Sequence, residues 1–314
     1  MTNIQTASTV KRRLRKFFGR FPQVKRAQER MEELYAYQCD GEEPEGLVII
    51  GDTGTGKTTL LENFVQSKPR VEHPEFTEVP VLYAEVPARC SVKLLAAILL
   101  RALGSPFWNR GDEAERTDQL GTLLKACRVR LIILDEVNHL ADRGAERSHY
   151  FVGDWIKQLM RSSRVPIVLA GTPAASILWD TNEQLADRFR EQIALQPLSM
   201  EASRVRELRS VLKTFLGLME GIPCIDITQE AHARSMAFAT AGRLRDIRRL
   251  LVRAVEIAAQ QPRVAITRST LAKAFLEVIY RDADAKRNPF NPKFDGLPLT
   301  KSGEPFAARG GLRR

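Results

Sequence analysis

Short runs of mainly apolar residues recur along the first two thirds of the chain. They lie at residues 47–50, 79–86, 129–134 and 165–170, and a fifth short strand is expected after Arg190. Apolar runs of this length are typical of strands that are buried on both faces of a parallel sheet. Apolar residues at helical spacing fill the intervening segments. The pattern predicts a three-layer α/β domain with a five-stranded parallel sheet over roughly residues 30–198.

The pattern changes near Met200, beyond which the spacing of apolar residues is helical throughout. Helices are expected over about 201–219, 228–240, 243–260 and 267–281. They predict a small helical domain at 199–282. Two flanking segments are expected to stand apart from both domains, namely a basic N-terminal arm at 1–29 and a flexible basic C-terminal tail at 283–314, which is rich in Pro and Gly.

A glycine-rich segment joins the first apolar run to the helical pattern that follows it. Residues 51–58 read G-D-T-G-T-G-K-T, which is the pattern of a phosphate-binding loop in the strand-to-helix context that the pattern needs. The glycines allow a tight turn whose N–H groups point at a phosphate, Lys57 would neutralise phosphate charge, and Thr58 would bind Mg²⁺. The residues expected to bind the nucleotide here are Gly51, Thr53, Gly54, Thr55, Gly56, Lys57, Thr58 and Thr59.

Two acids close the apolar run at 129–134. Asp135 and Glu136 follow this strand, whose carboxyl end should meet the phosphate-binding loop. This is a Walker B pattern, in which Asp135 would hold Mg²⁺ through water and Glu136 would act as general base toward the attacking water. His139 lies at the same rim and is assigned no catalytic part.

Three further residues are candidates for contacts with the γ-phosphate. Thr172 ends the fourth strand and would either hydrogen-bond the γ-phosphate or the attacking water, or cap the helix before Pro173. Arg188, preferred over Arg190, precedes the fifth strand and could reach the nucleotide of an adjoining protomer or form an internal salt bridge. Arg245 lies in a G-x-x-R pattern at the start of a helix of the second domain, where it could fold over the nucleotide.

The composition favours an anionic partner. The 48 Lys and Arg against 38 Asp and Glu give a net charge of +10, so nucleic acid is the first expectation and an acidic membrane surface the second. The four cysteines are widely separated, which favours reduced thiols in the cytoplasm. Neither a signal peptide nor a membrane span is expected.

Two regions are candidates for the contact with DNA. The first is the N-terminal arm, where Lys11 to Arg20 interleave basic residues with Phe17 and Phe18; it could equally be a solvated face, or pack its Phe pair on a neighbouring subunit. The second is a loop region within the nucleotide-binding domain. Its four basic residues are Arg89, Lys93, Arg101 and Arg110. The alternative is the ordinary charge of a surface loop.

These motifs together resemble those of AAA+ ATPases. More narrowly, residues from Gly46 to about Arg253 resemble the TniB and TnsC group of transposition ATPases, which are related to MuB. The resemblance rests on I-I-G-D-T-G-T-G-K-T-T, L-I-I-L-D-E-V-N-H-L and V-L-A-G-T-P followed by R-F-R. It implies a P-loop AAA+ sandwich followed by a helical lid.

The resemblance also implies a function. An ATP- and Mg²⁺-dependent protein of the bacterial cytoplasm would assemble on double-stranded DNA as a ring or helical filament. It would mark a target for a transposase, with a target-selection protein as a further partner, and hydrolysis would disassemble it. The alternatives are an initiator or helicase loader, and a nucleotide-gated signalling module that does not bind DNA. A small-molecule kinase is disfavoured because Glu136 suits the activation of water.

Overall fold

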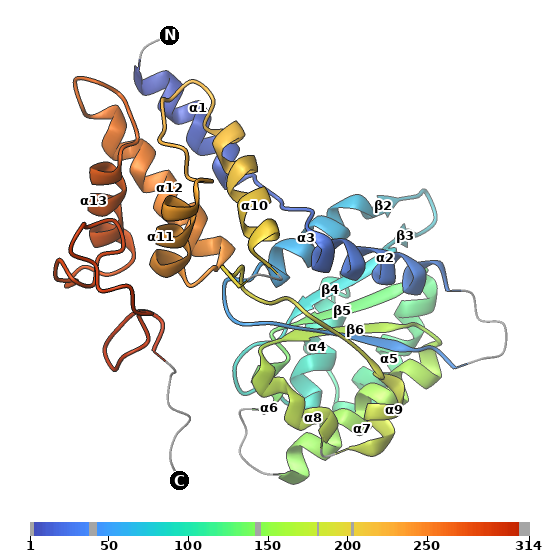
Figure 1. Cartoon of the computed structure of the whole chain (residues 1–314). Coiled ribbons are helices and arrows are strands. Elements are labelled where there is room, and N and C mark those ends of the chain that lie inside the picture. Colours follow the sequence, from blue (N-terminus) through green and yellow to red (C-terminus); the bar gives the residue numbers. More distant parts are fainter. Residues whose placement is uncertain (1–2, 38–42, 142–145, 181, 202–203, 308–314) are drawn as a thin grey trace. The chain divides into compact units, whose positions relative to one another are not determined.

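The computed structural model describes residues 3–37, 43–141, 146–180, 182–201 and 204–307, and the chain divides into two compact units. A core unit spans 22–195, and a helical unit combines 1–21 with 196–314 (Figure 1). These boundaries differ from the expected ones at the N-terminus. The expected arm at 1–29 is divided between the two units, with its first helix in the helical unit and its second in the core unit.

The core unit is built on a five-stranded parallel sheet in the order β4-β5-β6-β1-β7. The strands are β1 (Gly46–Ile50), β4 (Val81–Glu85), β5 (Leu131–Asp135), β6 (Ile167–Gly171) and β7 (Glu191–Ala194). All five residues of β5 and of β6 are buried, as expected for strands covered on both faces. A small antiparallel hairpin of β2 (Val71–Glu72) and β3 (Thr77–Glu78), which the sequence pattern did not predict, lies outside this sheet.

Helices cover both faces of the sheet (Figure 1). On one face lie α2 (Pro22–Ala36) and α3 (Lys57–Ser67); on the other lie α4 (Val92–Ala102), α5 (Glu113–Ala126) and α7 (Glu146–Ser163). Shorter helices complete the unit, namely α6 (Asn138–Ala141), the 3₁₀ helix η1 (Pro173–Ser176), α8 (Ile177–Asp180) and α9 (Glu183–Arg188). The predicted three-layer fold with a five-stranded parallel sheet is confirmed.

The helical unit holds α1 (Asn3–Arg15), α10 (Val205–Leu218), α11 (Glu230–Thr240), α12 (Leu244–Ala259) and α13 (Arg268–Val278). Helix α1 packs against α12 and α10 and buries Ala7, Val10 and Leu14. The ring of Phe17 lies 4.4 Å from that of Phe215, measured between centroids. The N-terminal basic segment therefore has a folded apolar side within its own chain.

The expectation of a flexible tail is corrected for residues 283–307. This stretch contains no helix or strand, yet it buries Phe290 and Leu299. Arg287 holds it together through ion pairs with Glu304 (2.6 Å) and Asp295 (2.8 Å), and the guanidinium lowers the pKa of the Glu304 carboxyl. The remainder of the predicted tail, 308–314, lies outside the described residues. Within the residues described, no helix is long and apolar enough to cross a membrane.

Candidate nucleotide-binding site

The turn between β1 and α3 requires its glycines. Gly54 and Gly56 have φ values of 88° and 106°, which side chains rarely tolerate. A Cβ on Gly51 would lie 2.4 Å from the carbonyl oxygen of Leu195. The turn is further tied by a hydrogen bond of 2.8 Å from the Thr55 hydroxyl to the carbonyl of Asp52. The backbone of the loop is thereby shaped as a cradle of the kind that holds phosphates.

Lys57 opens helix α3 and turns its side chain back into the loop. Its ammonium lies 2.7 Å from the carbonyl oxygen of Gly51 and 3.3 Å from that of Asp52, and the side chain is buried. A buried ammonium held beside the N-terminus of a helix makes a site for an anion. The loop residues therefore fit the phosphates of a nucleoside triphosphate.

The phosphate-binding loop meets the end of β5 directly. The Thr58 hydroxyl donates a hydrogen bond of 2.7 Å to Oδ2 of Asp135, and the other carboxylate oxygen accepts one of 2.8 Å from the Glu136 N–H. Asp135 is completely buried. A hydroxyl and a carboxylate side by side are oxygen ligands of the kind that Mg²⁺ uses with phosphates, so these two residues fit a Mg²⁺ ion.

Tyr83 is a contributor to this site that sequence reasoning missed. It projects from β4, the neighbour of β5, and its hydroxyl lies 3.3 Å from Oδ2 of Asp135. Burial and then the charge of Asp135 raise the pKa of the Tyr83 phenol, so it stays protonated and donates to the carboxylate. The sequence shows a tyrosine within the apolar run at 79–86, but it does not show that this strand pairs with the one that ends at Asp135.

Glu136 leaves the sheet with an unusual backbone. Its φ is 55°, a left-handed conformation that non-glycine residues seldom adopt and that often marks functional sites. His139, in the short helix α6 that follows, has its Nδ1 2.7 Å from the carbonyl oxygen of Val86. This contact ties α6 to the segment that follows β4, which is a structural role for His139.

Thr172 joins the same edge of the sheet through β6, which lies between β5 and β1. The N–H of Thr172 donates to Oδ1 of Asn138 (3.1 Å), and the N–H of Gly51 donates to the carbonyl of Gly171 (3.1 Å). Thr172 occupies the N-cap position of η1, but its hydroxyl makes no capping hydrogen bond. The structure therefore brings Thr172 to the edge that carries the loop, Asp135 and Glu136.

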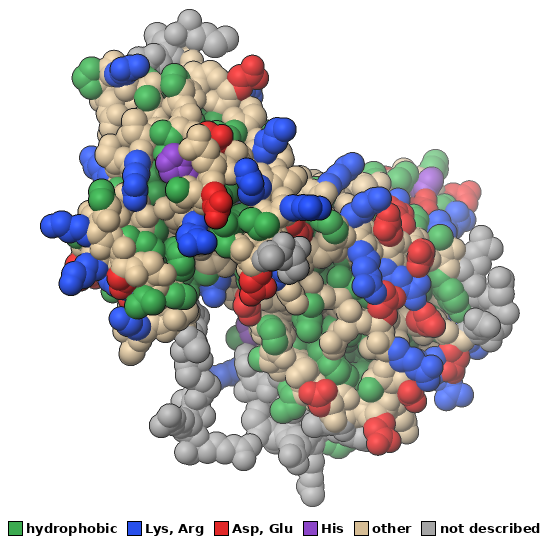
Figure 2. Space-filling model, in the orientation of Figure 1, with side chains coloured by type: hydrophobic (Ala, Val, Ile, Leu, Met, Phe, Trp, Pro, Cys, Tyr) green, Lys and Arg blue, Asp and Glu red, His purple; other side chains and the backbone are tan. Residues whose placement is uncertain are grey.

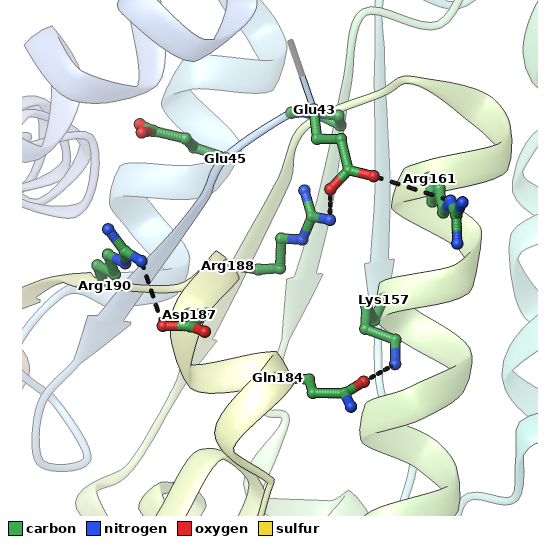
Figure 3. Close-up of a pocket in the computed structure, with 9 residues that line it drawn as sticks. Glu43, Glu45, Lys157, Arg161, Gln184, Asp187, Arg188 and Arg190 are labelled. Atoms are coloured by element: carbon green, nitrogen blue, oxygen red, sulfur yellow. Dashed lines mark hydrogen bonds and ion pairs between the residues drawn. The ribbon is translucent and has the colours of Figure 1, made fainter.

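Arg188 lies at the opposite end of the strands, where their amino ends are. It ends α9, just before β7 begins, and lines a cavity of about 480 Å³ together with Glu43, Lys157, Arg161 and other residues (Figure 3). Its guanidinium is paired with Glu43, which also contacts Arg161 at 3.7 Å. Arg190 is 80% exposed and pairs with Asp187 at 3.3 Å.

The remaining candidates lie elsewhere. Arg245, on the first turn of α12, belongs to the helical unit, and its Nε is 3.5 Å from Asp246. In the core unit, Arg101 lies over the ring of Trp108 at 5.4 Å and Arg110 over that of Phe107 at 5.0 Å. Both cations are thus engaged by aromatic rings. Arg89 has a φ of 59°, and Lys93 is exposed on α4.

The sheet order, the phosphate-binding loop between β1 and α3 and the separate set of helices define an AAA+ ATPase fold. The model of one family, described as bacterial TniB protein, matches residues 10–199. Because this match covers more than half of the chain, the protein belongs to the TniB family, and the resemblance seen in the sequence is confirmed.

Solved structures support the fold. The ORC1 protein of Aeropyrum pernix, in complex with DNA, matches with a TM-score of 0.60 and 21% identity over 82% of this chain and 66% of that one. Cdc6p from Pyrobaculum aerophilum matches with a TM-score of 0.62 and 16% identity over 86% of this chain and 70% of that one. The chain thus spans about two thirds of the length of these proteins. Comparison with curated protein sequences gives no significant match.

Proposed function

We propose that this protein is an ATP-dependent regulator of transposition. It oligomerises on double-stranded DNA, recruits or activates a transposase at the target, and leaves the DNA when ATP is hydrolysed. The family to which the chain belongs supports the link to transposition. The observation that carries the proposal is the direct contact between Thr58 and Asp135, because it joins a phosphate-binding loop to a metal-binding carboxylate beside Glu136.

Each residue around this contact would have its own role in ATP hydrolysis. Lys57 and the loop N–H groups would bind the phosphates, and Thr58 and Asp135 would hold Mg²⁺, which supplies charge neutralisation at the phosphates. Glu136 would accept a proton from the attacking water, and Thr172 would position the water or the γ-phosphate. Arg245 would close over the nucleotide from the helical unit.

The place of Arg188 supports a role between protomers. The phosphate-binding loop follows the carboxyl end of β1, whereas Arg188 precedes the amino end of the adjacent strand β7. A five-residue strand spans roughly 15 Å, which is too far for Arg188 to reach the phosphates of its own loop. We therefore assign it to the nucleotide of an adjoining protomer, so that assembly and hydrolysis are coupled through one contact.

The proposal is tested by electron microscopy of the protein with double-stranded DNA, in ATP and in ADP. Rings or filaments should form only with ATP. Glu136→Gln should bind ATP, hydrolyse it at least about a hundredfold more slowly, within the usual contribution of general-base catalysis, and hold longer filaments. Glu75→Gln, at an exposed glutamate between β2 and β3, is the matched control and should behave as the wild type.

Two results would contradict the proposal. Normal turnover of Glu136→Gln would remove the general-base role. Particles that remain dispersed and ignore DNA in both nucleotides would instead favour a nucleotide-gated signalling module.

A further inference from the structure

Positive charge is divided very unequally between the two units. The segments 1–21 and 196–314, which make up the helical unit, hold 27 Lys and Arg against 12 Asp and Glu, a formal charge of +15. The core unit at 22–195 holds 21 against 26, a formal charge of −5, and the two sum to the +10 of the whole chain. The net positive charge that attracts a polyanion is therefore concentrated in the helical unit.

Within the helical unit, α1 turns basic residues outward. Since Ala7, Val10 and Leu14 are buried against the neighbouring helices, Arg12, Arg15 and Lys16 fall on the exposed part of the helix surface. None of these three side chains has an ion-pair partner within the described part of the chain. They are available to an external anion.

Helix α12 adds basic residues next to those of α1. Arg248 donates a hydrogen bond of 3.4 Å to the backbone carbonyl of Arg15, so its guanidinium lies beside the C-terminal end of α1. Arg249, the next residue of α12, is exposed. We call the set of Arg12, Arg15, Lys16, Arg248 and Arg249 the α1–α12 basic face. Figure 2 shows Lys and Arg side chains spread over the visible face of the helical unit.

One acidic side chain near this face is paired with cations of the same unit. Glu256 of α12 is paired with Lys11 of α1 at 3.2 Å and with Arg253 at 2.8 Å. Burial raises the pKa of its carboxyl, but the hydrogen bonds and charges of Arg253 and Lys11 together lower that pKa below its usual value. Asp246 is buried, and its carboxylate lies 3.5 Å from the Nε of Arg245. Among the described residues, no ion pair joins an acid to any of the five residues of the face.

Several cations of the core unit, unlike Arg12, Arg15 and Lys16, are held by other groups of the chain. Arg101 and Arg110 lie over aromatic rings, and Arg30 is surrounded by Glu33, Glu45 and Glu191. Arg116 donates to backbone carbonyls, among them that of Asn109 at 2.7 Å. These side chains stabilise the fold of a unit that is negative as a whole.

We propose that the α1–α12 basic face binds the phosphate backbone of double-stranded DNA. This inference rests on the proposed function and names the surface that carries its DNA contact. A membrane surface is disfavoured because a helix that lies in a bilayer interface inserts its apolar side, and the apolar side of α1 is already buried within the helical unit. Phosphate contacts made by exposed Arg and Lys give binding that is strongly salt-dependent and only weakly dependent on sequence.

The test measures the affinity of the full chain for a labelled duplex, with ATP present, over a range of salt concentrations. The variant R12Q/K16Q/R249Q removes three exposed charges of the face. We expect its affinity to fall at least about tenfold. The slope of log affinity against log salt should become shallower by about 0.9 for each phosphate that is no longer neutralised, about 2.7 in all. ATP binding should be unchanged.

The matched control is K93Q/R101Q/R110Q, which removes three cations of the core unit and should retain the wild-type affinity and slope. The opposite result, with the core variant impaired and the helical variant unchanged, would overturn the assignment of the face while leaving the proposed function in place. A wild-type protein that ignores the duplex would overturn both. If that protein bound phosphatidylserine vesicles and R12Q/K16Q/R249Q did not, the face would be a membrane-binding surface.

Discussion

At the scale of the residue, the site depends on how one carboxylate is held. Asp135 is buried at the end of β5 and accepts hydrogen bonds from the Thr58 hydroxyl, the Glu136 N–H and the Tyr83 hydroxyl. These three donors act on both carboxylate oxygens and together fix the orientation of the Asp135 side chain at the end of β5.

Tyr83→Phe tests this arrangement. Since the phenol donates to the same oxygen as Thr58, its loss should leave Asp135 less firmly oriented. We expect the Mg²⁺ concentration that half-saturates ATP binding to rise about tenfold, within the range found when partners of metal ligands are removed.

The measurement is a Mg²⁺ titration of nucleotide binding, and Tyr280→Phe, in the helical unit, is the matched control. An unchanged titration for Tyr83→Phe would show that the phenol does not help to orient Asp135.

At the scale of the element, α1 illustrates how one helix has two roles. Its basic residues suggested an arm, but its apolar residues at spacings of three and four complete the packing of α10 and α12. The charges are thereby displayed on a rigid support. The residues after α13 are also held within their own chain. Arg287 pairs with Asp295 and Glu304 and so orders a stretch that has no helix or strand.

Leu14→Ala tests the structural role of α1. Leu14 is completely buried, so we expect the helical unit to lose about 2–5 kcal/mol of unfolding free energy. All three tryptophans, Trp108, Trp155 and Trp179, lie in the core unit. The far-UV circular dichroism transition should therefore move to lower denaturant while the tryptophan fluorescence transition stays in place.

Arg12→Ala is the control for this experiment, because Arg12 is exposed on the same helix and its loss should change stability by less than about 0.5 kcal/mol. Equal behaviour of the two variants would mean that α1 contributes nothing to the packing of the helical unit.

At the scale of the whole molecule, the two ends of the parallel strands carry different groups. The phosphate-binding loop lies at the carboxyl ends, and the cavity in which Arg188 is paired with Glu43 lies at the amino ends (Figure 3). An arginine that serves an adjoining protomer would exchange this carboxylate for a phosphate, so assembly would break the pair with Glu43.

Arg188→Ala should reduce ATP hydrolysis at least about tenfold, and only under conditions in which the protein assembles. Mixing this variant with Lys57→Ala, itself inactive, should restore part of the activity, because the second protein supplies Arg188 to the intact loop of the first. Arg190→Ala, whose side chain is exposed and paired only with Asp187 among the described residues, is the control and should hydrolyse ATP normally. The absence of rescue in the mixture would place Arg188 in a role within its own protomer.

The sequence alone predicted the sheet, the phosphate-binding loop and the pair Asp135 and Glu136. It could do so because each of these features is a continuous run whose conformation follows from local chemistry, namely apolar strands, glycines in a tight turn and acids at a strand end. The family followed from the same runs.

Tertiary structure decided the features that depend on residues distant in the chain. It brought Tyr83 to Asp135 and packed α1 on α10 and α12, which begin at Val205 and Leu244. It also ordered residues 283–307 around Arg287 and separated Arg188 from the phosphate-binding loop of its own chain. Such contacts arise from packing across the fold and leave no local pattern. The sequence therefore did not show that α1 packs within its own chain or that residues 283–307 are ordered.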